Sequence, residues 1–171
     1  MVTRPSNVVV LGATKGMGRA LARLMAQRGD RVFLLGRDLD ELRRSAGDLM
    51  SRSTAGHDVG VAICDLERPE TFEAALQKAE ASLGSIDIVV VTAAQFATQD
   101  RLEQDPDLAH RLLTVTFANT VTFCELARKR LLARGAGTLC VFSSVAGERG
   151  RKRVVLYGAA KAGLSRYLEG L

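Results

Sequence analysis

Hydrophobic residues along the chain follow two different spacings, and their alternation predicts the fold. Short continuous runs rich in Val, Ile and Leu are typical of strands that are covered on both faces. Between these runs the apolar residues recur every three or four positions, as in Met17, Leu21, Leu24 and Met25, which is typical of an amphipathic helix. The predicted strands are residues 7–12, 31–36, 58–65, 85–94 and 137–144. The predicted helices are residues 17–28, 38–50, 69–82, about 107–134 with a break near 114, and 157–171.

The order strand, helix, strand, helix is typical of an α/β protein with a Rossmann-type doubly wound parallel sheet in three α/β/α layers. The chain has 171 residues, of which 47% are hydrophobic, so we expect residues 1–171 to form one domain with a substantial core. No internal repeat, low-complexity segment or linker interrupts the pattern.

Composition narrows the function only a little. The cysteines Cys64, Cys124 and Cys140 stand singly in apolar runs without metal-ligand spacing, which predicts buried free thiols in a reducing compartment. No stretch has the pattern of a signal peptide or a membrane span, so we expect a cytoplasmic protein. Aromatic residues make up 5% and Trp is absent, which disfavours nucleic-acid binding by base stacking. The net charge of +5 suits an anionic small molecule equally well.

The first predicted strand runs into the sequence GATKGMG, which places glycines at positions 12, 16 and 18 before a helix. Glycine permits positive φ angles and lets a pyrophosphate group approach the main chain, and the helix start offers free N–H groups to that anion. The loop therefore predicts a dinucleotide-binding turn. A tight turn without a ligand is the alternative, but such a turn does not need three glycines.

Residues after the second and third strands bear on which dinucleotide binds. Arg37 follows the second strand, and Lys15 in the glycine loop can reach the same ribose, which favours the 2'-phosphate of NADP(H). Asp38 could instead hold the ribose hydroxyls of NAD(H). Asp38 followed by Glu41 also has the pattern of a helix N-cap with a reciprocal glutamate, so we favour NADP(H) and keep NAD(H) as the alternative. For Asp65, binding of the adenine amino group and capping of the next helix both remain open.

Tyr157 and Lys161 are four residues apart, so their side chains project from one face of a helix. A free tyrosine phenol titrates near pH 10, and a neighbouring ammonium group favours the phenolate. Ser144 ends the last predicted strand, where open α/β sheets bind their ligands. These three residues suggest a site for proton transfer, whereas an exposed helix face is the alternative for Tyr157 and Lys161 alone.

With the glycine loop, CDL at 64–66 and IDIVV at 86–90, these residues resemble the classical short-chain dehydrogenase/reductase family over the whole chain. The resemblance implies that Ser144 orients the carbonyl or hydroxyl group, Tyr157 is the acid/base, and Lys161 binds the nicotinamide ribose. It implies a hydride-transferring enzyme that forms a homodimer or homotetramer and needs no metal. The residues that it assigns to cofactor binding are Gly12, Thr14, Lys15, Gly16, Met17, Gly18, Arg37, Asp65, Leu66, Ala93, Tyr157 and Lys161.

Three features depart from the family pattern. The sequence 91–94 reads Val-Thr-Ala-Ala where the family has Asn-Asn-Ala-Gly, and Thr116 stands where the asparagine of the catalytic tetrad is expected. Asn119 lies three residues further along the helix, which makes it a poor geometric substitute. Family members continue beyond the position of Leu171, so we expect the C-terminal part of the family fold to be absent from this chain.

A basic loop, consisting of Arg149, Arg151, Lys152 and Arg153, separates Ser144 from Tyr157. It is either a solvated surface loop or a binding site for an anionic group of a carbonyl or alcohol substrate. The stretch from 143 to 164 is similar to that of reductases that act on polyprenyl-phosphoryl keto-pentoses, including decaprenylphosphoryl-2-keto-ribose reductase-like members. An NAD(P)-binding sensor or interaction module without catalysis is the alternative function, and a sugar-nucleotide epimerase is less well supported because its glycine loop normally reads GxxGxxG.

Overall fold

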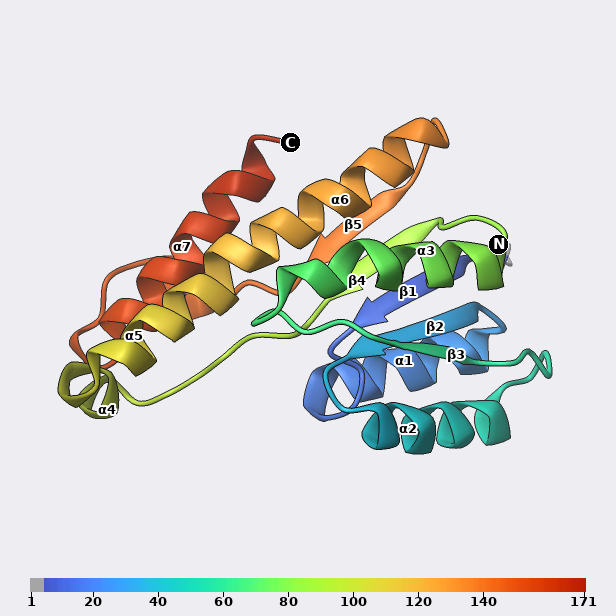
Figure 1. The fold of residues 1–171 in the computed structure, drawn as a ribbon, viewed down its shortest axis with the longest axis horizontal. Helices are drawn as coiled ribbons and strands as arrows, with labels where there is room; N and C mark the ends of the chain where they lie inside the picture. The colour runs from blue at the N-terminus through green and yellow to red at the C-terminus, as the bar shows by residue number, and fades with distance from the viewer. Residues whose placement is uncertain (1–4) are drawn as a thin grey trace.

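The computed structural model describes residues 5–171 and consists of one parallel sheet between two layers of helices (Figure 1). The strand order is β3-β2-β1-β4-β5, and every neighbouring pair is parallel. The predicted doubly wound sheet is therefore confirmed. The strands are β1 (Asn7–Leu11), β2 (Arg31–Gly36), β3 (Gly60–Ile63), β4 (Ile88–Val91) and β5 (Thr138–Val141).

The helices occupy the predicted segments, with one addition. They are α1 (Gly16–Arg28), α2 (Leu39–Arg52), α3 (Phe72–Leu83), α4 (Gln99–Gln104), α5 (Pro106–Leu113), α6 (Asn119–Ala133) and α7 (Val155–Glu169). The sequence pattern missed α4, because a helix of six residues is too short to show a periodic apolar face. Short helical turns are η1 (Pro69–Thr71), η3 (Val145–Gly147) and η4 (Lys152–Val154), and η2 (Thr114–Ala118) is π-helical. The predicted break near 114 is thus a π-helical segment that joins α5 to α6.

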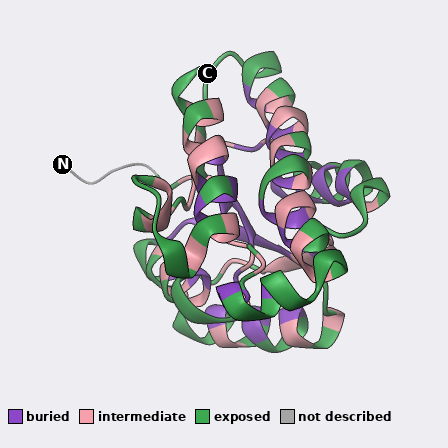
Figure 2. Ribbon diagram, turned by 90° about the vertical axis from the view of Figure 1, so that its left-hand side faces the viewer, coloured by how far each residue is buried: buried purple, intermediate pink, exposed green. Residues whose placement is uncertain are grey.

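Alternate residues of each central strand face opposite layers, and both faces are buried (Figure 2). Val8 and Val10 of β1 belong to the hydrophobic core beneath α1 and α2. Val9 and Leu11 belong to the core beneath α3 and α6. Burial on both faces explains why the strands read as continuous apolar runs rather than as alternating ones.

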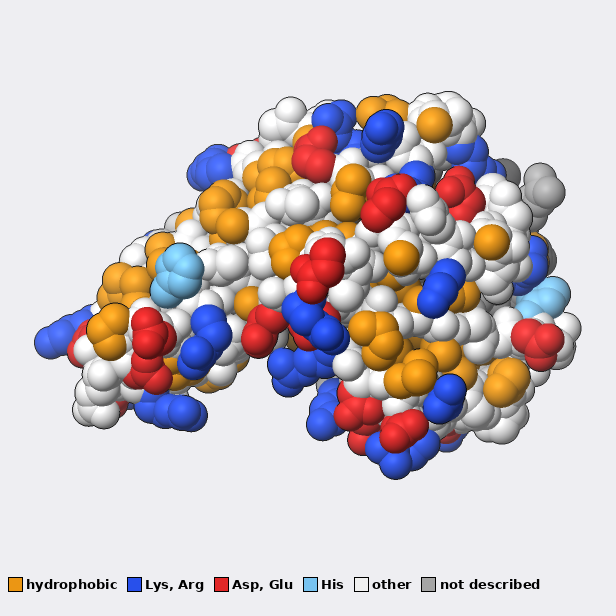
Figure 3. All heavy atoms as spheres, in the orientation of Figure 1, with side chains coloured by type: hydrophobic (Ala, Val, Ile, Leu, Met, Phe, Trp, Pro, Cys, Tyr) orange, Lys and Arg blue, Asp and Glu red, His pale blue; other side chains and the backbone are white. Residues whose placement is uncertain are grey.

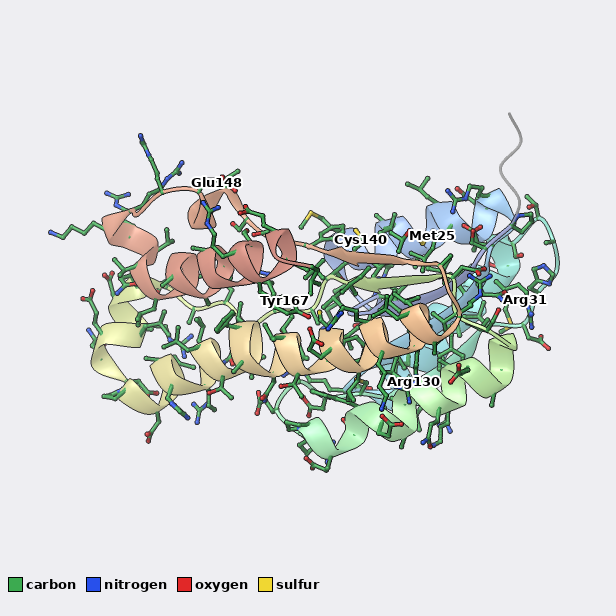
Figure 4. The ribbon with its side chains drawn as sticks, turned by 90° about the horizontal axis from the view of Figure 1, so that it is seen from above. Met25, Arg31, Arg130, Cys140, Glu148 and Tyr167 are labelled. Carbon is green, nitrogen blue, oxygen red and sulfur yellow. The ribbon has the colours of Figure 1, made fainter. Side chains whose placement is uncertain are left out.

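The prediction that all three cysteines are buried is wrong for Cys140, although Cys64 and Cys124 are buried free thiols. Cys140 lies on β5, which is an edge strand of the sheet (Figure 4). Leu139 and Val141 of this strand pack against the core on the α6 side, so the side chain of Cys140 points to the other face, where it is exposed. No helix within residues 5–171 is long and apolar enough to span a bilayer.

Candidate active site

A cavity of about 440 Å³ opens at the carboxyl ends of the strands. The connections of β1 and β4 leave these neighbouring strands in opposite directions, which is the place where open α/β sheets bind ligands. Figure 3 shows the surface hollowed between the part that carries α4 and α5 and the part that carries α2. The lining residues are Leu11, Gly12, Thr14, Gly36, Arg37, Cys64, Asp65, Leu66, Glu67, Ala93, Ala94, Gln95, Phe96 and Val115.

The glycine turn packs tightly on its inner side and leaves space on its outer side. A Cβ atom at Gly18 would lie 2.4 Å from the carbonyl oxygen of Gly12 and 2.4 Å from Oγ1 of Thr92, so only glycine fits there. At Gly16 the φ angle is +53°, and a Cβ atom would meet nothing within 4 Å. Lys15, the N-cap of α1, makes no side-chain cap, and the first turn holds no acidic residue. The free N–H groups and the open space fit a phosphate group of a dinucleotide.

Thr92 ties the end of β4 to the glycine turn. Its hydroxyl lies 3.2 Å from the carbonyl oxygen of Leu11 and 3.1 Å from that of Gly12, and it donates to them. The main-chain N–H groups of Thr92 and Ala93 donate to the same oxygen of Leu11. In the altered sequence Val-Thr-Ala-Ala, the side-chain hydrogen bonds to the glycine turn are therefore made by the hydroxyl of Thr92.

Asp38 is the N-cap of α2, as the sequence predicted. Its carboxylate accepts hydrogen bonds from the N–H groups of Asp40 and Glu41, both at 3.0 Å. The N–H of Glu41 holds the pKa of Asp38 below its ordinary value, and the charges of Arg44 and Lys15 act in the same direction. The expected reciprocal bond from Glu41 is not formed, because its carboxylate accepts a 2.8 Å hydrogen bond from Arg44 one turn further along.

Two predicted cations flank the cavity near α2. Arg37 lines it and has a side chain that is 76% exposed, with Glu67 as a loose partner at 3.9 Å. Lys15 is also exposed, on the turn before α1. Gly16, Met17 and Gly18 belong to the same turn but do not line the cavity itself. Within residues 5–171 neither cation is held in a close ion pair, so both side chains can turn toward an anionic ligand.

The loop after β3 lines the cavity with Asp65, Leu66 and Glu67. Asp65 does not cap η1; instead its carboxylate accepts a 3.0 Å hydrogen bond from the N–H of Glu67. Leu66 is buried, and its carbonyl oxygen accepts a 2.6 Å hydrogen bond from Nδ2 of Asn119 at the start of α6. Asn119, which its position on the helix makes a poor substitute for the tetrad asparagine, thus has a contact that no local pattern shows, because its partner lies 53 residues away.

Tyr157 lies in the first turn of α7, next to the cavity rather than in its lining. Its ring packs edge-on against Phe96, which does line the cavity, with ring centroids 5.2 Å apart and an interplanar angle of 85°. Ser144 caps η3, where its hydroxyl accepts a 3.2 Å hydrogen bond from the N–H of Ala146. A Cβ atom at Gly158 would lie 2.6 Å from the carbonyl oxygen of Ala146, so η3 packs directly beside Tyr157.

Lys161 is 3% exposed and approaches Tyr157 from the same face of α7, as predicted from the spacing. Its Nζ atom lies 6.0 Å from the centre of the Tyr157 ring and donates a 2.7 Å hydrogen bond to the carbonyl oxygen of Phe142. Burial lowers the pKa of Lys161. An ammonium group has three donors, and this one gives one of them to Phe142, so it retains donors for a ligand or for Tyr157.

Thr116, at the expected asparagine position, is buried in the π-helical segment η2. Its hydroxyl donates to the carbonyl oxygen of Gln95 at 3.1 Å and accepts from the N–H of Gln95 at 3.2 Å. Both hydrogen-bonding functions of this hydroxyl are therefore used by the main chain of one residue in the cavity wall. Among residues 5–171, no group of three or more His, Cys, Asp or Glu side chains is arranged to hold a metal ion.

Comparison with known proteins places the chain in a family. Residues 6–171 match the sequence model of a family described as short chain dehydrogenase. The chain is 34% identical over 168 residues to an uncharacterized oxidoreductase in the mprA 5' region of Streptomyces coelicolor, covering 98% of this chain and 65% of that relative. It is 32% identical to a 3-oxoacyl-[acyl-carrier-protein] reductase of Bos taurus, covering 91% of this chain and 63% of that protein.

Solved structures of other proteins share the fold of this chain. A crystal structure of F189W actinorhodin polyketide ketoreductase with NADPH superposes with a TM-score of 0.87 at 25% identity, covering 99% of this chain and 65% of that one. A short-chain type dehydrogenase/reductase from Mycobacterium ulcerans gives a TM-score of 0.87 at 21% identity, covering 93% of this chain and 58% of that one. The chain thus spans less than two thirds of the length of these proteins. The narrower resemblance to polyprenyl-phosphoryl keto-pentose reductases stays a prediction.

Proposed function

Because the chain belongs to the short chain dehydrogenase family, we propose that it is an NADP(H)-dependent oxidoreductase that interconverts a carbonyl group and a secondary alcohol. One observation carries the proposal. A single cavity runs from the glycine turn to Phe96, whose ring packs against Tyr157. This arrangement supports a dinucleotide bound along the cavity with its reactive end toward Tyr157.

A bound nicotinamide dinucleotide would supply the hydride for reduction and accept it in oxidation. In reduction, Tyr157 donates its phenolic proton to the substrate oxygen as that oxygen gains negative charge, and it becomes a phenolate. The hydroxyl of Ser144 holds the same oxygen in place. The ammonium group of Lys161, buried on the Tyr157 side of α7, favours the phenolate, which then regains a proton from solvent. Because the hydroxyl of Thr116 is occupied by Gln95, we expect no proton relay through that residue.

The two tyrosines of the chain provide a matched test of this mechanism. Tyr157→Phe should reduce turnover of a carbonyl substrate by about 10²-fold or more, since general acid catalysis contributes about 10²–10⁴-fold. Its NADPH affinity should stay the same. Tyr167→Phe, which changes a tyrosine bonded to Glu125 between α7 and α6 (Figure 4), should retain turnover. Equal turnover of Tyr157→Phe and the unmodified protein would refute the acid/base role.

The preference for NADP(H) is supported by the exposed side chains of Arg37 and Lys15 and by the engagement of Asp38 in its helix cap. The related actinorhodin ketoreductase structure contains NADPH. Arg37→Ala should raise the Kd for NADPH by about tenfold or more, because hydrogen bonds to charged groups contribute about 1.5–3 kcal/mol. The Kd for NADH should stay unchanged in this variant. Arg43→Ala removes an exposed arginine paired within α2 and is the control.

We also propose that the substrate carries an anionic group. All four side chains of the basic loop are exposed, and none of them takes part in an ion pair within residues 5–171. The loop directly precedes α7 and Tyr157. Replacing Arg151 and Arg153 by alanine should raise KM for a phosphorylated carbonyl substrate and leave KM for its neutral analogue unchanged. An equal effect on both substrates would contradict this assignment.

A homodimer or homotetramer is the proposed assembly, and light scattering at micromolar concentration tests it. Phe117 and Val155, next to α6 and on α7, are exposed apolar side chains that a second copy could cover.

Residence in the cytoplasm is a further proposal and is supported by the free thiols Cys64 and Cys124. The alternative of a sensor or interaction module without catalysis is not favoured, because the matched family and both relatives are dehydrogenases, oxidoreductases or reductases.

A further inference from the structure

Two oppositely charged side chains meet at one end of the cavity. Arg37 comes directly after β2, and Glu67 lies in the turn after β3, the strand that neighbours β2 in the sheet. Both residues line the cavity, and Nη1 of Arg37 lies 3.9 Å from Oε1 of Glu67. Both side chains are exposed, so the pair lies where the cavity opens to water. A ligand that binds between the ends of β2 and β3 therefore meets this pair.

The two carboxylates in the cavity lining differ in how their charge is balanced. Asp65 has an arginine of its own, because Nε of Arg68 lies 3.4 Å from its carboxylate. Within residues 5–171, Glu67 forms an ion pair with Arg37 alone. In the same part of the chain, Arg37 is the only cation that lines the cavity. An anion that binds to Arg37 thus competes with Glu67 for the same guanidinium group.

Main-chain hydrogen bonds hold the turn that carries Glu67. The N–H of Glu67 donates a 3.0 Å hydrogen bond to the carboxylate of Asp65, and the N–H of Arg68 donates to the carbonyl oxygen of Asp65 at 2.8 Å. The carbonyl group of the preceding residue, Leu66, is held by Asn119 of α6. Because the turn is fixed, the carboxylate of Glu67 moves only by rotation of its own side chain and remains at this end of the cavity.

We propose that Glu67 is a specificity-determining residue that opposes the binding of the 2'-phosphate of NADP(H). The inference rests on the proposed function, in which Arg37 binds that phosphate. A phosphate monoester carries about −1.5 to −2 charges near pH 7, and at Arg37 it comes close to the carboxylate of Glu67. Like charges at short range repel, and Arg37 must also give up part of its interaction with Glu67.

NAD(H) has a hydroxyl group in place of this phosphate and meets no such repulsion. Glu67 therefore reduces the preference for NADP(H) that Arg37 and Lys15 create. The consequence is a site that binds both dinucleotides with more similar affinities than its two cations alone would give.

Glu67→Gln tests the proposal, because glutamine keeps the size of the side chain and removes its charge. The Kd for NADPH, measured by nicotinamide fluorescence at low salt, should fall about three- to fivefold, which is the range that one exposed ion pair reaches. The Kd for NADH should stay unchanged. At about 1 M salt, where the Debye length is about 3 Å, most of the gain should disappear.

Glu70→Gln is the matched control. Glu70 is an exposed carboxylate in η1, three residues further along, and it does not belong to the cavity lining. Its replacement makes the same change in net charge and should leave the Kd values of both dinucleotides unchanged. Adenosine 2',5'-bisphosphate and adenosine 5'-monophosphate differ only in the 2'-phosphate. Glu67→Gln should tighten binding of the first fragment and leave that of the second unchanged.

An unchanged or higher Kd for NADPH in Glu67→Gln, or an equal fall for NADPH and NADH, would overturn the inference. A failure of the proposed NADP(H) preference gives a different result, because Arg37→Ala would then leave the Kd for NADPH unchanged. If Arg37→Ala weakens NADPH binding and Glu67→Gln has no effect, the inference alone fails and the proposed function stands.

Discussion

The contrast between Gly18 and Gly47 gives a sharp prediction about the glycine turn. Both glycines lie in helices, α1 and α2, where alanine is intrinsically the better residue by about 1 kcal/mol. A Cβ atom at Gly47 would meet nothing within 4 Å. At Gly18 it would lie 2.4 Å from the carbonyl oxygen of Gly12 and from Oγ1 of Thr92. The same substitution should therefore stabilise one helix and destabilise the other.

The magnitude follows from these distances. Ordinary contacts of a Cβ atom are 3.4–4 Å, so at Gly18 the turn would have to move by about 1 Å. Overpacking costs about 1–3 kcal/mol, and the upper end applies because one obstacle is main chain. After the gain in helix propensity, Gly18→Ala should lose about 2 kcal/mol of unfolding free energy. Gly47→Ala should gain about 0.5–1 kcal/mol.

Thermal unfolding followed by circular dichroism measures both changes. For a protein of this size, 1 kcal/mol shifts the melting temperature by about 2–4 °C, so Gly18→Ala should melt about 4–8 °C lower. Gly47→Ala should melt slightly higher. If the melting temperature of Gly18→Ala equalled or exceeded that of the unmodified protein, the close packing of the turn would be refuted. Gly16→Ala adds a test of the ligand: with φ at +53° it should lose about 1–2 kcal/mol of stability, and it should also weaken NADPH binding.

Three further substitutions probe contacts that fix the site and its surroundings. Thr92→Val removes the hydroxyl that reaches two carbonyl oxygens at the end of β1, so chemical denaturation should show a loss of about 1 kcal/mol together with weaker NADPH binding. Asp48→Asn tests an ion pair between α2 and α1: hydrogen bonds from Arg23, and from a second arginine of its own helix, lower the pKa of Asp48. A lowered folded-state pKa stabilises the protein above about pH 4. The melting temperature of Asp48→Asn should therefore be lower than that of the unmodified protein at pH 7, and the gap should shrink as the pH falls below about 4. Tyr167→Phe removes a 2.7 Å hydrogen bond to Glu125, and its melting temperature should fall by a few degrees, corresponding to about 1 kcal/mol.

The spacing of residues along the chain was enough to predict the strands, the glycine turn and the helix that form the candidate site. The continuous apolar runs identified all five strands. In the central strands β1, β2 and β4 this pattern follows from burial on both faces, which needs apolar residues at successive positions. The glycine spacing placed the turn before α1, and the four-residue interval placed Tyr157 and Lys161 on one face of α7. Each of these features belongs to one element, and its geometry depends only on neighbouring residues.

Contacts between distant segments were decided by the tertiary structure. The pairing of Thr116 with Gln95 spans 21 residues, and that of Asn119 with Leu66 spans 53, so no local pattern could reveal either. The exposure of Cys140 depended on the position of β5 at the sheet edge, since the residues around it resemble those of a buried strand. The sequence by itself determined the layers and the residue types at the strand ends. Which of those residues share hydrogen bonds was decided by the crossover connections that bring the strand ends together.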